Sequence, residues 1–400
     1  MQLSTLLYNF GKFFGIIGFA CLSFLIFSGD TARFWDRFFG LDKIIKFQRK
    51  FSLVVAFFIL FHPIFFILST KSISNYLIPD FSVLPLALGI VAGYLFIIVM
   101  ISSSIYKRVS YTIWQYIHIL IYLLFFFALY HASNWGSDSS NIYLKTLYAT
   151  SLILIVVGAT YRTQYKIRKR FSGKFFVKNI QRETEDTFIL TIEPEKKLNF
   201  KAGQFCFLRL NKNELYARHP FTISSSPDEY NLQFAIKDTG RFTKTASELK
   251  NTEEILIDGP FGKFIKQDKK KDLVFIAGGV GITPFMSMIR DCLKHEGTQN
   301  VTLIYCSKTE DNIIFKNELD SIHKNWFKKI YILSQNKKLP VADYIENGYI
   351  TKTIIEKYVE NIDEALYYIC GPELMKENTK RILKDLKINK KNILVEDFFW

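Results

Sequence analysis

Three histidines stand inside long apolar runs in the first third of the sequence. They are His62, His118 and His131. Ionisable side chains are rare inside membrane segments and usually have a function there. Neutral imidazole is the usual axial ligand of b-type haem, so two helices that each present a histidine can form a bis-histidine site. The simpler alternative for any one of them is a hydrogen bond at a contact between helices.

Two glycine-containing motifs have the chemistry of nucleotide binding. In LVFIAGGVGITPFMSMIR (residues 273–290), three glycines follow an apolar strand and precede a helix. Backbone N–H groups at such a helix start can approach a phosphate, and proline fits the first turn because no N–H is needed there. In IKDTGRFTKTASEL (residues 236–249), Gly240 permits a tight turn before a second helix whose free N–H groups can hold an anion.

Three further segments are candidates for a functional site because of their positions beside apolar strands or at the end of the chain. RHPFTISSSP (residues 218–227) follows the apolar pattern AGQFCFLRL, although a proline-containing turn between strands is the simpler interpretation. Cys370 ends an apolar strand in YYICGPELM, where a lone cysteine is more often a buried core thiol. The chain ends in LVEDFFW, whose aromatic side chains could simply anchor the terminus.

Five apolar segments are long enough to cross a bilayer, which needs roughly 20 helical residues. They are Phe10–Phe27, Phe47–Leu68, Val83–Ile101, Tyr111–His131 and Ile142–Tyr161. The first lacks the basic start and cleavage site of a signal peptide, so we expect it to be retained. The segment Thr31–Lys46 mixes aromatic and basic residues and is typical of an amphipathic helix at a membrane surface.

The basic residues predict how these spans are oriented. Residues 1–170 contain sixteen Lys/Arg, five Asp and no Glu, so they carry +11 of the total charge of +15. Thirteen of these sixteen basic residues fall at one set of helix ends, which is a positive-inside signal. The N-terminus is then outside, and the chain is cytosolic from the basic linker Tyr161–Arg170 onward. Because the excess charge lies beside apolar runs, it indicates membrane topology rather than nucleic-acid binding.

From Lys174 the pattern changes to short alternating strands separated by turn residues, which predicts a small antiparallel β-barrel. From Asp272 strands alternate with helices, which predicts a parallel doubly wound α/β sheet. The predicted domains are a membrane α-helical bundle at 1–170, the β-barrel at 171–268 and the α/β domain at 269–400. The five cysteines form no Cys-x-x-Cys pair, and we expect reduced thiols.

KFQRKFSLVVAFFILFHP (46–63) and WQYIHILIYLLFFFALYH (114–131) resemble the ferric-reductase-like transmembrane family, which includes NADPH oxidases and metalloreductases. The resemblance implies that His62 and His131 pair to hold an outer b-type haem. Gln48 stands where that family has an inner haem ligand, so His118 is left without a histidine partner. One span precedes the first histidine helix, where oxidases of the family have two.

The residues alone leave the histidine pairing open. Gln48 and His62 fall on one face of an ideal helix, about 21 Å apart. His118 and His131 fall about 140° apart, so both face one interior only if the helix bends or bulges. Counting depth along the helices also permits a pair of His62 with His118. An inner haem on His118, with Gln48, water or nothing opposite, is a further alternative.

RHPFT resembles the flavin signature of the ferredoxin-reductase superfamily. The resemblance implies that His219 contacts the FAD pyrophosphate, that Phe221 beside Pro220 packs on the isoalloxazine, and that the Thr222 hydroxyl approaches flavin N5. It extends the FAD contacts to a second group of residues, which comprises Lys237, Gly240, Phe242 and Thr243.

GGxGITP resembles the superfamily's NAD(P) pyrophosphate loop. The residues implied in it are Gly278, Gly279, Gly281, Thr283 and Pro284. In the Cys370-Gly371-Pro372 element, the cysteine is implied to lie near nicotinamide C4. Ser307 and Lys308 occupy the place of adenosine-ribose contacts, and the choice between NADPH and NADH stays open. Trp400 is implied to cover the flavin, with Phe398 packed behind it and Glu396 in the polar role before it.

The resemblance implies an NAD(P)H oxidase or a ferric-reductase-like flavohaem oxidoreductase of the plasma (inner) membrane. A hydride passes from NAD(P)H to cytosolic FAD, and single electrons then pass to haem and to an acceptor at the outer face. The acceptor is O₂, which gives superoxide, or a ferric or cupric complex. The alternative is an electron-supply component of a larger system, which serves a periplasmic redox partner protein or a quinone-linked chain.

Overall fold

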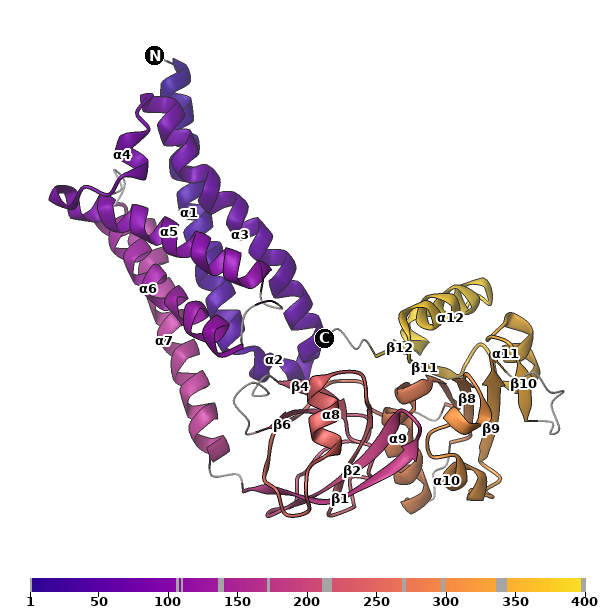
Figure 1. Cartoon of the computed structure of the whole chain (residues 1–400). Coiled ribbons are helices and arrows are strands. Elements are labelled where there is room, and N and C mark those ends of the chain that lie inside the picture. Colours follow the sequence, from indigo (N-terminus) through magenta and orange to yellow (C-terminus); the bar gives the residue numbers. More distant parts are fainter. Residues whose placement is uncertain are drawn as a thin grey trace. The chain divides into compact units, whose positions relative to one another are not determined.

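The computed structural model of the chain describes residues 2–105, 108, 111–135, 140–170, 173–210, 218–267, 271–295, 299–335 and 344–396. These residues belong to two compact units, Met1–Phe171 and Ser172–Trp400 (Figure 1). The long apolar helices lie in the first unit, and the β-strands lie in the second.

The first unit is a bundle of long apolar helices. They are α1 (Gln2–Asp30), α3 (Leu41–Thr70), α5 (Leu84–Ser104), α6 (Tyr111–Trp135) and α7 (Ile142–Arg170). All five are long and apolar enough to cross a membrane, as the sequence predicted. The shorter elements are α2 (Ala32–Phe39), α4 (Ser74–Leu77) and the 3-10 turn η1 (Phe81–Val83).

Two segments of the bundle differ from the prediction. Gly40 has a positive φ of 87°, and it ends α2 and precedes α3. The predicted amphipathic segment is therefore divided between a short helix and the start of a span. Helix α7 continues to Arg170 through the predicted basic linker. Its last turns contain neither glycine nor proline, and lysine and arginine favour helix, so nothing ends it earlier.

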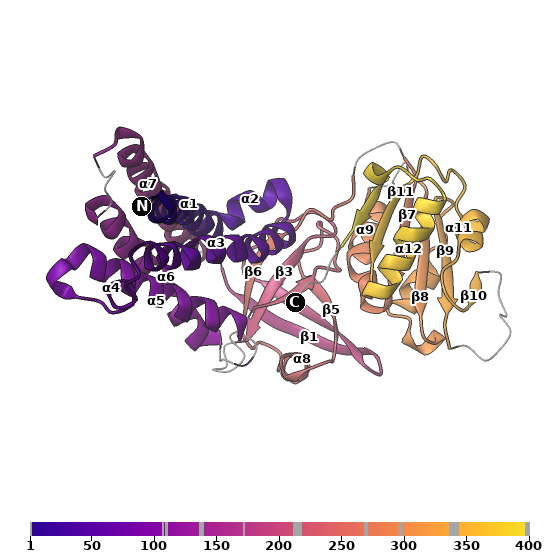
Figure 2. The same cartoon turned by 90° about the horizontal axis from the view of Figure 1, so that it is seen from above.

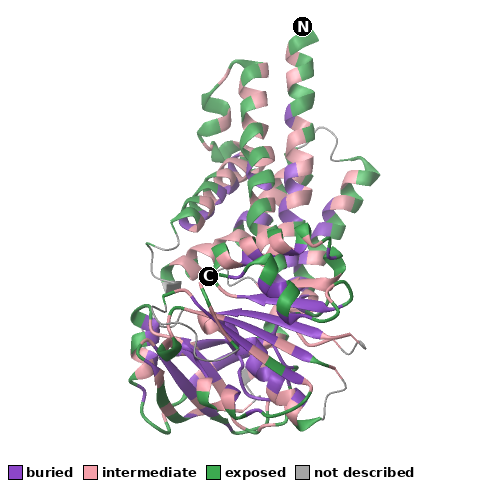
Figure 3. Ribbon diagram, turned by 90° about the vertical axis from the view of Figure 1, so that its right-hand side faces the viewer, coloured by how far each residue is buried: buried purple, intermediate pink, exposed green. Residues whose placement is uncertain are grey.

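The bundle is assembled from two tightly packed helix pairs, α1 with α3 and α5 with α6. Small residues allow the close approach: a Cβ on Gly18 would lie 3.2 Å from Ile59 Cγ1. Fully buried side chains from several helices form a packed layer inside the bundle. We define this packed layer as Leu22, Val55, Leu124 and Phe125. The outward faces of the helices are largely exposed apolar surface, as expected for contact with lipid (Figure 3).

The second unit begins with two three-stranded antiparallel sheets, whose strand orders are β1-β2-β5 and β4-β3-β6. The strands are β1 (Phe175–Thr184), β2 (Thr187–Pro194), β3 (Phe205–Leu210), β4 (His219–Thr222), β5 (Leu232–Lys237) and β6 (Ile255–Phe261). Their apolar side chains share one core with the short helix α8 (Arg241–Ser247). The predicted antiparallel strands are confirmed, arranged as two sheets around a common core.

A parallel six-stranded sheet follows, in the order β10-β9-β8-β7-β11-β12. Its strands are β7 (Leu273–Gly278), β8 (Val301–Ser307), β9 (Phe327–Leu333), β10 (Ile345–Asn347), β11 (Leu366–Cys370) and β12 (Ile393–Val395). Its helices are α9 (Thr283–Lys294), α10 (Lys316–Ser321), α11 (Lys352–Tyr358) and α12 (Glu373–Asp385). This confirms the predicted doubly wound sheet.

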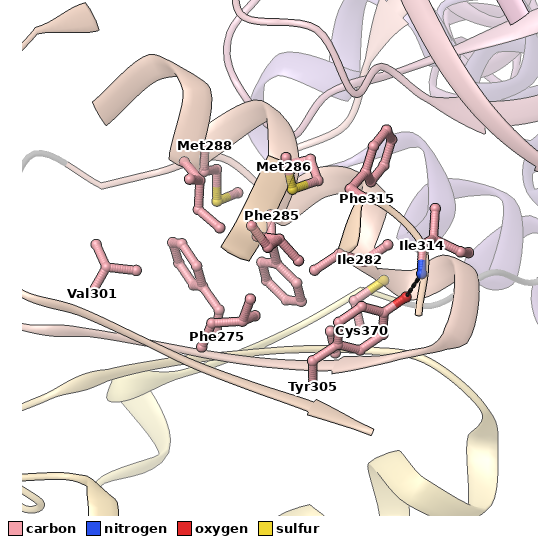
Figure 4. Close-up of a cluster of buried hydrophobic side chains, with 14 of the residues drawn as sticks. Phe275, Ile282, Phe285, Met286, Met288, Val301, Tyr305, Ile314, Phe315 and Cys370 are labelled. Carbon is pink, nitrogen blue, oxygen red and sulfur yellow. Dashed lines mark hydrogen bonds between the residues drawn. The ribbon is translucent and has the colours of Figure 1, made fainter. Parts of the chain in front are cut away.

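The two faces of the parallel sheet have separate cores. Alternate side chains of a strand point to opposite faces, so Phe275 joins the core under α9, and Ile276 joins the core under α11 and α12 (Figure 2). Figure 4 shows the first core, where the Tyr305 hydroxyl accepts a hydrogen bond from the Ile314 backbone N–H at 3.1 Å.

Arg290 on α9 joins the antiparallel sheets to the parallel sheet. Its guanidinium makes a bidentate pair with Glu318, at 2.7 and 2.6 Å, and donates to Ser224 O at 2.9 Å and to Gln233 Oε1 at 2.8 Å. One turn earlier, the Ser287 hydroxyl donates to Ser225 O at 2.7 Å. Planar bidentate pairs of this kind fix geometry as well as energy.

Replacing Arg290 with alanine should loosen this joint. We expect Arg290→Ala to lower the free energy of unfolding by about 2 kcal/mol, because charged hydrogen bonds are lost and their acceptors stay partly buried. A thermal melt of the full chain followed by flavin fluorescence measures the loss. Lys352→Ala is the control, because its pair with Glu356 is 54% and 46% exposed and such pairs contribute little. Equal effects of the two substitutions would contradict the joint.

Candidate functional site

His62 on α3 and His131 on α6 face each other inside the bundle. Their ring centres are 6.3 Å apart and the rings are inclined at 78°. Both line a cavity of about 480 Å³, which is in the range of cofactor sites. The remaining lining is mainly apolar and aromatic, and includes Phe19, Phe66 and Tyr148. The structure therefore brings together the pair that the resemblance implied.

A backbone carbonyl fixes each of these two imidazoles. His62 Nδ1 lies 2.8 Å from Gly11 O on α1, and His131 Nδ1 lies 3.0 Å from Pro85 O on α5. A carbonyl oxygen can only accept, so Nδ1 carries the proton in both rings. Nε2 is then left as the nitrogen with a free electron pair, which is the form that binds a metal.

Two glycines give the rings their space. A Cβ on Gly15 would lie 2.5 Å from His62 Nδ1, and a Cβ on Gly89 would lie 2.5 Å from His131 Nδ1. Each glycine is four residues after the residue whose carbonyl accepts from that ring. We call each carbonyl–glycine pair, Gly11 with Gly15 and Pro85 with Gly89, a histidine cradle. The sequence analysis missed the cradles, although small residues four apart are a known signal of close helix contact.

The dimensions of this pair suit haem. His62 and His131 would be the two protein ligands of a haem iron, and a separation of 6.3 Å between their ring centres leaves space for a metal atom between the rings. The described part of the chain contains no group of three or more His, Cys, Asp or Glu side chains that could hold a bare metal ion. Haem needs only two such ligands, because the porphyrin supplies four nitrogens.

His118 is not part of this pair. Helix α6 is α-helical throughout, without a bulge, so His118 and His131 point in different directions. The His118 ring stacks on Trp114 with centres 4.8 Å apart, and its buried Nδ1 has no hydrogen-bond partner among the described residues. Gln48 Nε2 donates to Ser28 Oγ at 3.4 Å.

In the second unit, the glycine loop after β7 touches the turn after β11. A Cβ on Gly281 would lie 2.4 Å from Cys370 O, and one on Gly278 would lie 2.7 Å from Pro372 Cδ. The strands pair in parallel with Ala277 opposite Cys370. Glycine is required where two backbones approach so closely. The predicted nucleotide loop and the Cys-Gly-Pro element are therefore in contact.

The same loop is positioned by neighbours that the sequence did not reveal. The Tyr305 hydroxyl of β8 donates to Gly279 O at 3.0 Å. The Thr283 hydroxyl donates to Val280 O at 3.0 Å, and Pro284 lies in the first turn of α9, as predicted. The Cys370 thiol is fully buried in the core beside Tyr305, so its predicted place near nicotinamide C4 stays a prediction (Figure 4).

Aromatic side chains gather around the predicted flavin signature. His219 stacks on Phe242 with ring centres 3.9 Å apart, and Phe221 lies nearly parallel to the same ring at 5.9 Å. Burial lowers the pKa of His219, so this imidazole is neutral near pH 7. Thr222 is 5% exposed at the end of β4, and Thr243 Oγ1 accepts from the Gly240 N–H at 3.0 Å. The signature residues and the start of α8 are therefore neighbours.

The other predicted site residues lie at strand ends and on the sheet surface. Lys237 pairs with Asp186 at 2.8 Å on the exposed face of the antiparallel sheet. Ser307 ends β8, and Lys308 follows it as an exposed side chain.

The C-terminal segment lies beside the β11 strand, because the Glu396 N–H donates to Ile369 O at 2.9 Å. Pro220 lies in β4 and Gly371 precedes Pro372 at the end of β11. Phe398 and Trp400 lie outside the described residues.

Three family models match successive parts of the chain. Residues 14–129 match the ferric reductase like transmembrane component, residues 173–265 a FAD-binding domain, and residues 275–381 an oxidoreductase NAD-binding domain. The chain has the fused architecture of the NADPH oxidase family. It is a multi-pass membrane protein that joins a part similar to the ferric reductase transmembrane component to FAD-binding and oxidoreductase NAD-binding domains.

Curated relatives resemble parts of the chain. The electron transfer component of 2-halobenzoate 1,2-dioxygenase from Burkholderia cepacia is 28% identical over 217 residues, which are 53% of this chain and 62% of that protein. A component of the Na⁺-translocating NADH-quinone reductase from Histophilus somni is 28% identical over 164 residues, 40% of each chain. The chain thus spans between 40% and 62% of the length of these relatives.

Solved structures show the fold of the FAD and NAD domains. The flavohaem-like FAD/NAD-binding domain of a nitric oxide dioxygenase from Vibrio cholerae aligns with a TM-score of 0.51 and 18% identity, over 57% of this chain and 99% of that chain. A cytochrome P450 reductase from Amycolatopsis aligns with a TM-score of 0.51 and 20% identity, over 56% and 69%.

Because the glycine loop touches the Cys-Gly-Pro turn, adding one methyl group to Gly281 should greatly slow the reduction of flavin by NAD(P)H. We expect Gly281→Ala to slow flavin reduction by NAD(P)H at least about 100-fold, because its Cβ displaces the Cys370 carbonyl and reshapes the phosphate loop. FAD content should stay unchanged. Stopped-flow absorbance of the flavin measures the rate. Val280→Ala, in the same loop but without an added atom, should change it less than about 3-fold. Equal rates in both variants would contradict this role of the loop.

Proposed function

We propose that this chain carries electrons from cytosolic NAD(P)H, by way of FAD and a b-type haem, to an acceptor at the outer face of the plasma (inner) membrane. The observation that carries the proposal is the His62–His131 pair, because its separation and tautomers suit axial ligation of haem. When bound, FAD accepts a hydride and releases electrons singly, and haem iron accepts one electron at a time.

The nucleotide half supplies positioning rather than acid–base chemistry. The loop of Gly278, Gly279 and Gly281 offers backbone N–H groups to the NAD(P) pyrophosphate. His219 and Phe221 provide flat surfaces for FAD, and Thr222 offers a buried hydroxyl for flavin N5. Trp400 would cover the flavin until nicotinamide displaces it. The roles of His219, Phe221 and Thr222 extend the family resemblance to residues whose neighbours suit them, and the role of Trp400 rests on the resemblance alone.

The membrane half orients its ligands. The histidine cradles hold both imidazoles with Nδ1 on a carbonyl, and most of the cavity lining is apolar. A preformed site of this kind favours fast transfer because little has to reorganise. The acceptor is O₂ or a ferric or cupric complex. The second candidate is electron supply to a partner, favoured because the two named relatives are components of larger assemblies.

The glycine cradle at His131 provides a matched test of haem ligation. We expect Gly89→Ala to displace His131, because a Cβ there would lie 2.5 Å from Nδ1, and so to remove most of the low-spin b-type haem spectrum. Gly93→Ala is one turn along the same helix and lines the same cavity, but its Cβ would meet nothing within 4 Å. That variant should keep the spectrum. Loss in both, or in neither, contradicts the cradle.

Transfer across the membrane can be measured in sealed proteoliposomes. NADPH is added outside, and ferricyanide, which does not cross lipid, is trapped inside. We expect the trapped ferricyanide to be reduced by the native chain and at least about 10-fold more slowly by His131→Ala. Reduction of external ferricyanide by FAD should continue in both. An unchanged rate inside with His131→Ala would contradict the proposed function. Superoxide inside vesicles that contain only O₂ would identify the oxidase, and its absence would favour a partner.

A further inference from the structure

We propose that the bundle holds one haem, at the His62–His131 pair, and that Asp30, Tyr122 and Arg162 close the other half of the bundle. The family resemblance would place a second haem in that half, on His118. The inference rests on the haem site proposed above, and it concerns the number and place of the cofactor rather than its existence.

The cavity that contains the histidine pair does not reach His118. On the side toward His118 it ends at Leu22, Ile59 and Leu124, and neither Gln48 nor His118 lines it. Leu22 and Leu124 are 1% and 2% exposed and belong to the packed layer. Protein interiors are closely packed, so this layer separates the cavity from His118. We infer that the cavity has space for a haem at the His62–His131 pair and does not extend to a second one.

His118 lacks both parts of the cradle that the other two histidines have. Its buried Nδ1 has no hydrogen-bond partner among the described residues, so no carbonyl fixes its tautomer. His118 is not among the nearest atoms that an added Cβ would meet at the bundle glycines Gly11, Gly15, Gly18, Gly29, Gly89, Gly93 and Gly158. Metal-binding histidines almost always donate their second ring N–H to a carboxylate, a backbone carbonyl or water. The opposite position is Gln48, whose amide donates to Ser28 instead.

A hydrogen-bonded network lies next to His118. We define the inner network as Asp30 at the end of α1, Tyr122 one turn after His118 on α6, and Arg162 on α7. The Tyr122 hydroxyl donates to both Asp30 oxygens, at 2.6 and 2.8 Å. Arg162 Nη1 lies 3.1 Å from Asp30 Oδ1 and donates to the Tyr122 hydroxyl at 3.1 Å.

The inner network is built into the bundle rather than attached to its surface. The Asp30 side chain is 3% exposed and that of Arg162 is 33% exposed. Gly158 on α7 makes the room, because a Cβ there would lie 3.2 Å from Asp30 Cβ. A buried carboxylate is retained only with donors on its oxygens, so these three helices must stay together at this level. These contacts tie α1, α6 and α7 together one turn along α6 from His118, which disfavours a porphyrin between the helices there.

Haem counting tests the proposal on the full-length chain with FAD. The protein is titrated with haemin until its spectrum stops changing, and haem is counted by pyridine haemochrome against amino-acid analysis. We expect one haem per chain in the native protein and in His118→Ala, and none in His131→Ala. Two haems per chain, or a lower count in His118→Ala, overturns the proposal. No haem in the native chain would instead overturn the proposed function itself.

Tyr122→Phe tests the inner network separately, because it keeps the ring and removes only the hydroxyl. We expect a lower melting temperature, with the haem count, the spectrum and the midpoint potential unchanged. The potential is a readout that a purely structural residue far from haem does not move. A shifted midpoint potential, or two one-electron waves in a potentiometric titration of the native chain, would place a haem beside the network and overturn the proposal.

Discussion

The His62–His131 pair, the proposed haem site, depends on two hydrogen bonds that run from a histidine to the backbone of a neighbouring helix. His62 belongs to α3 but is held by α1, and His131 belongs to α6 but is held by α5. Each bond therefore fixes a ring and also joins the two helices of a packed pair. Because a carbonyl oxygen cannot donate, the same contact selects the tautomer and leaves Nε2 as the nitrogen with a free electron pair. Ligand geometry and helix packing are one constraint here.

In both units of the chain, glycine residues, which have no side chain, allow predicted functional groups to lie close together. In the membrane, Gly15 and Gly89 admit imidazole rings at distances that a Cβ would forbid. In the second unit, Gly281 leaves space for the Cys370 carbonyl, so the glycine loop after β7 packs directly against the Cys-Gly-Pro turn. Parallel pairing of β7 with β11 makes that meeting unavoidable, because the carboxyl ends of both strands lie at the same edge.

Much of this could be predicted from the sequence, because its signals are local. Hydropathy located five spans, and glycine loops between strand and helix predicted a nucleotide site. What the sequence could not show depends on partners that are distant in the chain. The carbonyl of Gly11 for His62, the hydroxyl of Tyr305 under Gly279, and the Asp30–Arg162 pair are such cases. Helix α7 also continues beyond the predicted end of its span, Tyr161, to Arg170. A span is predicted from the length of its apolar run, which says nothing of the helix propensity of the polar residues that follow.

The proposed function requires that nicotinamide electrons reach a haem held by His62 and His131. Anaerobic stopped-flow mixing of the full chain, loaded with FAD and haem, with excess NADPH follows these electrons. We expect flavin absorbance to bleach first and the haem then to become fully reduced in a single exponential phase. A flavin that is reduced while the haem stays oxidised would contradict the proposed electron path, even if haem is bound.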